Sequence, residues 1–266
     1  GQADAKRLAG HSVQVKAIDV NDELAVTADV SGQIIVWQLS DWKILADLKA
    51  NTSIVDLALI PGSRDFVYAG VRGGQSSEVL AYRVAAEKDQ SSLQRLGQLR
   101  ISRTHNYPAS GLSVSPDGKL LVVSNRTNGS LFVLKAAGAD ANGADKQFPF
   151  SQPADLEAEG DMSWLVSHHS RPVNDLQWSA DGTQFLTASD DRRIGVWSTP
   201  GANDPSATLT FRRYLRGHGA RVMQAGFINA EASQISSTSA DGFSRLWDLQ
   251  THEEDSREIR KAFNLS

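Results

Sequence analysis

Short runs in which apolar and polar residues alternate recur along the chain, and turn-forming residues separate them. The segment Leu215–Leu249 shows the pattern most clearly, because Val222–Ile228 and Ser233–Ser239 are alternating runs of strand length. Asp241-Gly242 follows the second run and Phe243–Leu249 supplies a third, which predicts three antiparallel strands with a tight turn. A sheet of this size is not stable alone. It needs similar sheets stacked on both of its faces.

The same arrangement recurs along the sequence. It divides the chain into five repeats, at about residues 8–48, 50–101, 105–135, 162–214 and 215–259. An aromatic or apolar residue closes the third strand of each repeat, namely Trp37, Tyr82, Leu134, Trp197 and Trp247. The runs that follow predict outer strands at Trp42–Leu48, Leu93–Ile101, Thr208–Tyr214 and Glu253–Ile259. Residues 136–160 break the pattern with Ala, Gly, Asp, Glu and Pro, so we expect a flexible insertion between the third and fourth repeats.

Polar residues recur at fixed places in the repeats as well. In the fifth repeat Gly217-His218 precedes the first strand, serines lie on the second, Asp241 lies in the turn and Trp247-Asp248 closes the third. This combination resembles the WD repeat, the unit of the WD-repeat β-propellers. The resemblance covers nearly the whole chain except residues 136–160 and the last few residues. It implies an all-β fold of four-stranded antiparallel blades, in which the start of each repeat supplies the outer strand of the preceding blade.

The resemblance also implies a set of hydrogen bonds within a blade, joining a His, a Ser or Thr, an Asp and a Trp. The sets are His218, Ser237 or Ser239, Asp241 and Trp247; His169, Thr187 or Ser189, Asp191 and Trp197; and His11, Thr27 and Trp37. Of the alternative hydroxyls we assign Ser189 and Ser239. In the first repeat Ser31 stands where the turn Asp is expected, and Asp29 precedes it by two residues. A buried imidazole and a buried carboxylate are costly alone and tolerable together, so we expect structural staples and not catalytic pairs.

Closure of the propeller leaves two alternatives. WD-repeat propellers usually contain six to eight blades, most often seven, whereas this sequence shows five repeats. The five repeats are either a segment of a larger propeller of about seven blades or a five-bladed ring closed by Asp4–Ala9. We favour the first alternative, because an open row of blades exposes two faces that further blades would cover. The missing initiator Met agrees with this preference.

Composition narrows the classes of partner and of site. About 40% of the residues are apolar, which allows a large core, and the net charge of −4 predicts neither nucleic acid nor a membrane as a general partner. No apolar run is long enough to span a bilayer, and the N-terminal residues contain no apolar signal core. The absence of Cys excludes disulfides and thiolate metal sites, and it does not fix the compartment.

Catalytic and metal-binding motifs are also missing. The chain contains no Gly-rich phosphate loop, no Gly-x-Ser-x-Gly and no His-Glu-x-x-His. The repeated histidines occupy equivalent places in different blades, so they do not converge on one metal. A propeller enzyme, either a hydrolase or a lyase with a channel site, would need acids or histidines at the starts of the inner strands, where Val15, Val173 and Val222 stand. We therefore expect no enzyme activity, no cofactor and no metal.

The remaining hypothesis is a protein-interaction scaffold. A propeller holds many loops on a rigid frame, and its partner would be a protein or peptide bound on the face formed by the loops before the inner strands. Candidate contact residues on that face are Arg171, Arg221, Tyr107, Asp190 and Arg192. The alternative is a purely architectural segment of a multidomain scaffold.

Arginines are concentrated near the start of the fifth repeat. Arg212, Arg213, Arg216 and Arg221 lie close together in sequence, with Arg192 and Arg193 in the preceding repeat. Such a cluster could bind acidic peptide, phosphate or nucleic acid. For the pair in the outer strand, Arg212 and Arg213, we prefer the simpler interpretation that charge protects an exposed sheet edge.

Overall fold

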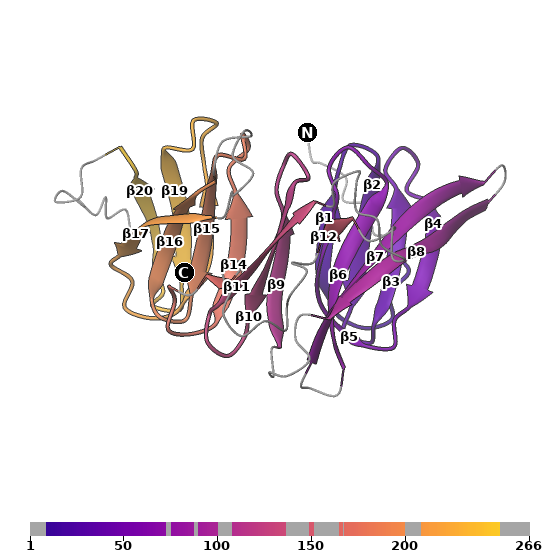
Figure 1. The fold of residues 1–266 in the computed structure, drawn as a ribbon, viewed down its shortest axis with the longest axis horizontal. Coiled ribbons are helices and arrows are strands. Elements are labelled where there is room, and N and C mark those ends of the chain that lie inside the picture. Colours follow the sequence, from indigo (N-terminus) through magenta and orange to yellow (C-terminus); the bar gives the residue numbers. More distant parts are fainter. Residues whose placement is uncertain are drawn as a thin grey trace.

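The computed structural model describes residues 9–72, 76–87, 90–100, 108–136, 149–151, 165–166, 168–199 and 209–250, and within them the regular structure consists of β-strands alone. The strands form five antiparallel sheets, here called blades 1 to 5 (Figure 1). The all-β propeller architecture expected from the sequence is confirmed.

Each blade is a meander of strands in chain order. Blade 1 contains β1 (Val15–Val20), β2 (Leu24–Asp29), β3 (Gln33–Gln38) and β4 (Ile44–Lys49). Blade 2 contains β5 (Ser53–Leu59), β6 (Asp65–Arg72), β7 (Ser76–Glu87) and β8 (Gln90–Arg100). Blade 4 contains β14 (Val173–Trp178), β15 (Gln184–Ser189), β16 (Arg193–Ser198) and β17 (Thr210–Arg216). Blade 5 contains β18 (Val222–Phe227), β19 (Gln234–Ser239) and β20 (Ser244–Asp248).

Blade 3 is completed by two short strands. Its meander of β9 (Ala109–Val114), β10 (Leu120–Asn125) and β11 (Leu131–Ala136) is flanked by β12 (Phe150–Ser151) and β13 (Leu165–Val166), which both pair with β11. Phe150 is buried in the core between blades 2 and 3. The expected insertion at 136–160 thus contributes part of the blade edge, and its residues 137–148 and 152–160 lie outside the described residues.

Apolar side chains fill the space between consecutive blades. Ile34 and Phe66 belong to the core between blades 1 and 2, and similar clusters join each later pair. The six residues of β10 are all buried, because blades 2 and 4 cover this middle strand from both sides, and the six residues of β2 in blade 1 are buried as well. Stacking between blades therefore supplies the core that a single small sheet lacks.

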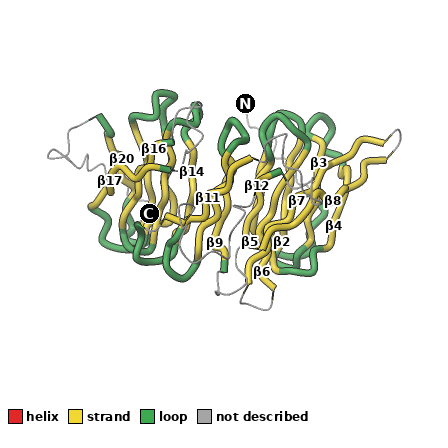
Figure 2. Tube along the Cα trace, viewed as in Figure 1, coloured by secondary structure: helices red, strands yellow, loops and turns green. Residues whose placement is uncertain are grey.

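As far as the structure describes the chain, the row of blades is open. The inner strands β1, β5, β9, β14 and β18 contact one another in chain order. Blades 1 and 5 lie at opposite ends of the row (Figure 1), and the loops gather along its two edges (Figure 2). Of the strands expected at the chain ends, Glu253–Ile259 and residues 4–8 of Asp4–Ala9 lie outside the described residues.

The two end blades expose apolar side chains. Those of blade 1 are Val13, Val15, Ile18, Val20, Val30, Trp42 and Ile44, and those of blade 5 are Met223, Ile228, Phe243 and Leu246. All the large apolar side chains that are exposed in the described part of the chain belong to these two blades. The blades between them bury the corresponding surfaces against a neighbour.

Candidate functional site

Blade 5 contains a buried chain of polar side chains. Nδ1 of His218 lies 2.9 Å from Oδ2 of Asp241, and its Nε2 lies 2.8 Å from Oγ of Ser237. The indole Nε1 of Trp247 donates a hydrogen bond to the same hydroxyl at 2.8 Å. Ser239 instead donates to backbone carbonyls of the loop before β18. The assignment of Ser239 to this set was wrong, and Ser237 takes its place.

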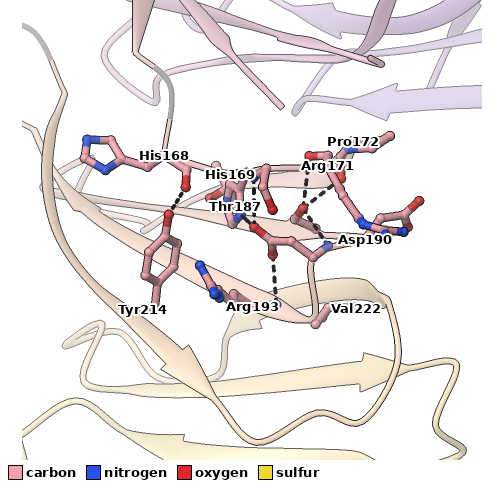
Figure 3. A network of polar contacts seen from close by, with 12 residues as sticks. His168, His169, Arg171, Pro172, Thr187, Asp190, Arg193, Tyr214 and Val222 are labelled. Atoms are coloured by element: carbon pink, nitrogen blue, oxygen red, sulfur yellow. Dashed lines mark hydrogen bonds and ion pairs between the residues drawn. The ribbon is translucent and has the colours of Figure 1, made fainter. Parts of the chain in front are cut away.

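The same arrangement recurs in blade 4. His169 Nε2 lies 2.7 Å from Thr187 Oγ1 (Figure 3). His169 Nδ1 lies 2.8 Å from Asp191 Oδ2, and Trp197 Nε1 donates to Thr187 Oγ1 at 3.0 Å. Ser189 donates to carbonyls of the loop before β14. The hydroxyl of this set is therefore Thr187, and the assignment of Ser189 was wrong.

In blade 1 the acid of the hydrogen-bonded set lies two residues before the turn position. His11 Nδ1 lies 2.9 Å from Asp29 Oδ2, its Nε2 lies 2.7 Å from Thr27 Oγ1, and Trp37 Nε1 donates to Thr27 at 2.8 Å. Asp29 ends β2, and its other oxygen accepts the hydroxyl of Ser31 at 2.6 Å. The carboxylate that the turn lacks is thus supplied by Asp29, and Ser31 supports it.

Donor and acceptor capacities fix the direction of these chains. An indole N–H can only donate and an ionised carboxylate can only accept, so Trp donates to the hydroxyl and Nδ1–H of a neutral imidazole donates to the carboxylate, which leaves Nε2 to accept the hydroxyl proton. A catalytic nucleophile needs an oxygen that the substrate can reach. Ser237 is only 2% exposed and is held between the indole and the imidazole, so this geometry suits a structural staple.

The staple carboxylates are held in their charged form. For Asp241, burial by itself raises the pKa, but hydrogen bonds from the Gly219 N–H, His218 and the Phe243 N–H outweigh it and lower the pKa to about 2. For Asp29, burial likewise raises the pKa, and bonds from its neighbours outweigh burial and lower it to about 2. The stapled histidines sit in separate blades, and in the described part of the chain no group of three or more His, Asp or Glu could hold a metal ion.

Carboxylates on the inner strands link consecutive blades, and this role was not expected from the sequence. Oδ2 of Asp56 on β5 accepts the N–H of Leu112 on β9 at 3.0 Å. Oδ2 of Asp175 on β14 accepts the N–H of Ala225 on β18 at 3.1 Å, and Asp19 on β1 bonds to the backbone of β5 at 2.8 Å. The available signal was the pair of similar segments at residues 54–57 and 173–176, IVDL and VNDL.

Burial dominates the electrostatics of these inner carboxylates. It raises the pKa of Asp56 to about 6; the hydrogen bond from Leu112 opposes the shift, and the charges of Asp19 and Asp175 add to it. Burial also raises the pKa values of Asp19 and Asp175. All three carboxylates accept backbone N–H groups of the next blade, which gives them a structural use at the inner edge of the propeller.

A pocket of about 560 Å³ opens where the loops of blade 4 meet those of blade 5. Its walls come from the loop before β14 with Arg171, the β15–β16 turn with Asp190 and Arg192, and the loop before β18 with Arg221. Four of the five residues expected on the partner-binding face are thus brought together in one concave site. The fifth, Tyr107, lies outside the described residues.

Several charged groups of the pocket already have partners. Asp191 is engaged in the blade 4 staple, and Asp190 accepts the side-chain amide of Asn174 at 2.8 Å. The guanidinium of Arg193, which also lines the pocket, lies 5.0 Å from the centroid of the Tyr214 ring. These contacts fix one side of the pocket.

Three arginines remain available to a ligand. The ion pairs within blades 4 and 5 of the described chain centre on the two staple aspartates, and they involve none of Arg171, Arg192 and Arg221. All three residues are exposed. With four Arg against two Asp, the lining carries a formal charge of +2, whereas the whole chain carries −4.

Arg192 adopts an unusual backbone conformation for a residue with a side chain. Its φ is 72°, in the left-handed region, and its N–H donates to the carbonyl of Ser189 in the tight turn before β16. The turns before the third strands of blades 1, 3 and 5 place glycines in this region, Gly32, Gly129 and Gly242, with φ of 87°, 70° and 83°. The pocket thus forms beside a turn that has an arginine in the conformation that glycine favours.

Comparisons with known proteins agree with the architecture. The family described as WD domain, G-beta repeat matches residues 162–198. The WD repeat protein iqw1 of Schizosaccharomyces pombe is 30% identical over 114 residues, which cover 40% of this chain and 14% of that protein. The guanine nucleotide-binding protein subunit beta-like protein of Encephalitozoon cuniculi is 27% identical over 155 residues, 56% of this chain and 37% of that protein.

Another relative and a solved structure extend the comparison. The pre-rRNA-processing protein IPI3 of Mycosarcoma maydis is 31% identical over 108 residues, 35% of this chain and 18% of that protein. The crystal structure of the Cps50 (Swd1) β-propeller domain of Myceliophteria thermophila superposes with a TM-score of 0.70 at 13% identity, over 96% of this chain and 75% of that one. The matched segments make up less than half of the length of iqw1, of the guanine nucleotide-binding protein subunit beta-like protein and of IPI3. No helix in the described ranges has the length and apolar character needed to cross a bilayer.

Proposed function

Because the chain carries WD repeats and folds as blades of a β-propeller, we propose that it is a non-catalytic protein-interaction scaffold. WD-repeat proteins generally bind protein partners, and the relatives above support this general role. The finer part of the proposal is that a protein or peptide docks on the face formed by the loops before the inner strands. Loops on a rigid frame can vary in specificity without disturbing the core.

The observation that carries this placement is the pocket between blades 4 and 5. It gathers Arg171, Arg192 and Arg221 from three separate segments and leaves them without ion pairs to described residues. Arginines in a concave site are frequent anchors of protein contacts. The inner-strand acids, which a channel enzyme would need, are instead bonded to the backbone of the next blade.

The test compares partner capture by two double variants. In Arg171→Ala/Arg221→Ala two pocket cations are removed, and in Lys119→Ala/Arg212→Ala two cations are removed from outside the pocket. Quantitative affinity purification should recover the same partner proteins with the wild type and with the second variant. The amount of these proteins recovered with the first variant should be lower by about tenfold or more. Equal capture by all three proteins would show that partners dock elsewhere.

We further propose that the five repeats are consecutive blades of a larger propeller, with the boundaries given above. The exposed apolar faces of blades 1 and 5 support this, because each matches a surface that the inner blades bury. The coding sequence on either side of the segment provides the test. We expect further WD-type repeats there, and flanking sequence without them would contradict the proposal.

A further inference from the structure

We propose that the pocket between blades 4 and 5 binds the phosphoryl group of a phosphorylated side chain in the partner protein, through Arg171, Arg192 and Arg221. This inference rests on the proposed function, because it names the chemical group that the same face recognises. Three features of the pocket support it: the space between the two blades, the charge of the lining and the origin of its arginines.

The space depends on the residue in the blade 4 turn. A Cβ placed on Gly129 of blade 3 would lie 2.2 Å from the carbonyl oxygen of Arg171 in the next blade, and one on Gly32 of blade 1 would lie 2.7 Å from that of Thr52. At both junctions the loop of the next blade therefore packs directly on the glycine. Arg192 has a Cβ in the same conformation, so the blade 5 loop cannot approach so closely, and the pocket opens at this junction.

The backbone conformation of Arg192 also carries a cost. Residues with a side chain rarely occupy the left-handed region, and such strain concentrates at sites where the side chain is used. Glycine would relieve the strain, as it does in the corresponding turns. An arginine here adds strain and at the same time places a guanidinium at the pocket, which is the pattern expected of a binding residue.

The charge of the pocket fits a phosphate monoester. Its lining has a formal charge of +2, and a phosphorylated side chain carries about −1.5 to −2 at neutral pH. A carboxylate would neutralise only half of the excess. Guanidinium groups match phosphate oxygens with paired N–H donors, and the three available arginines approach from three separate segments.

The size and extent of the pocket favour a protein ligand. A volume of about 560 Å³ holds a phosphoryl group together with the residues on either side of it. Nucleic acid would require a basic surface that follows several backbone phosphates, and the chain has a net charge of −4. We therefore assign the pocket to a single phosphorylated residue in a peptide.

The experiment uses two probes with the 266-residue chain. Phenyl phosphate is titrated while NMR follows the Nε–H signals of the arginines. Peptide mixtures with randomised flanks and a fixed central phosphoserine, serine or glutamate are then compared for binding by fluorescence anisotropy. We expect phenyl phosphate to shift the signals of Arg171, Arg192 and Arg221 but not that of Arg212, and the phosphoserine mixture to bind at least tenfold more tightly than the other two.

Matched variants separate binding from folding. Arg192→Gly should weaken binding of the phosphoserine mixture about tenfold while the protein remains folded, because glycine suits this turn. Arg212→Ala, on the outer strand of the same blade, should leave binding unchanged. Equal binding of the serine mixture, equal binding of the glutamate mixture, or undiminished binding by Arg192→Gly would each overturn the proposal.

The outcomes distinguish this proposal from the proposed function. If Arg171→Ala/Arg221→Ala loses partners but neither phosphate probe binds, the docking face stands and phosphate recognition is refuted. If the probes bind as expected and partner capture is unaffected, the pocket is a phosphate site and the docking face is misplaced.

Discussion

Replacing Asp241 by Ala tests the staple of blade 5, and with it the repeat alignment. Asp241 accepts hydrogen bonds from His218 Nδ1 at 2.9 Å, from the Gly219 N–H at 2.8 Å, from the Phe243 N–H at 3.0 Å and from Arg245 Nη1 at 3.3 Å. The imidazole side chain is only 1% exposed, so its N–H cannot turn to water when the carboxylate is removed. Gly219 and Phe243 are exposed and can be solvated.

The expected loss of stability follows from this difference. A buried donor left without an acceptor costs about 1–3 kcal/mol, and the two solvated N–H groups add less. We therefore expect Asp241→Ala to lower the free energy of unfolding by about 3 kcal/mol. In a domain of this size that corresponds to a fall in melting temperature of roughly 6–12 °C.

The matched control is Asp190→Ala. Asp190 accepts one hydrogen bond, from the amide of Asn174, and that amide also donates to the carbonyl of Val222. We expect a loss of under about 0.5 kcal/mol. Urea unfolding followed by Trp fluorescence compares the two variants, and equal midpoints would refute the repeat alignment.

Acid pH provides a second readout for Asp241. Its pKa is lowered to about 2 in the folded protein, below the ordinary value of 3.8, so the stability that it contributes is present above about pH 4. That contribution is lost as the pH falls from about 4 toward 2. The difference in unfolding midpoint between wild type and Asp241→Ala should therefore narrow at pH 2.5, and a constant difference would contradict the charged-carboxylate account.

Three further substitutions test other features. Arg192→Gly should raise the free energy of unfolding by about 0.5 kcal/mol, because relief of about 1 kcal/mol of strain exceeds the added chain entropy; a lower urea midpoint would contradict this. Gly129→Ala should lower the free energy of unfolding by about 3 kcal/mol, because the added Cβ would meet the Arg171 carbonyl. Gly242→Ala has open space around the added Cβ and should cost only about 1 kcal/mol, from its left-handed φ. Similar falls in melting temperature for the two variants would contradict this packing argument. Because the folded pKa of Asp56 is raised to about 6, Asp56 should add on the order of 3 kcal/mol of stability as the pH falls from about 7 to 4. Urea midpoints of Asp56→Asn should rise less over this range than those of the wild type, and an equal rise would contradict this assignment.

The strand pattern was largely predictable because its signals are local. The expected runs Val222–Ile228 and Ser233–Ser239 became β18 and β19 with ends shifted by one residue. The hydroxyl of the staple was not predictable, because residues two apart share one face of a strand. Ser237 and Ser239 both face the right side, and only their positions along the blade decide that one meets the indole and the other meets the loop.

Features formed between segments were less accessible to sequence reasoning. Phe150 lies in a polar, Ala- and Gly-rich stretch, and a strand of two residues has no period to detect. The sequence placed Arg171, Arg192 and Arg221 on one face, but their convergence depends on how closely two blades approach. Backbone contacts set that distance, for example the contact between Gly129 and the loop of the next blade. No local sequence pattern reveals such contacts.

The open end of blade 5 gives the pocket a thermodynamic link to whatever covers that end. Blade 5 supplies one wall of the pocket but packs against a described neighbour on one side only, so in isolation it should fray before the inner blades. A molecule or a sixth sheet that buries Met223, Phe243 and Leu246 would hold that wall in place. Thermodynamic linkage makes this effect reciprocal. A partner that stabilises blade 5 should raise the affinity of the pocket for its ligand, and the ligand should stabilise blade 5 by the same free energy.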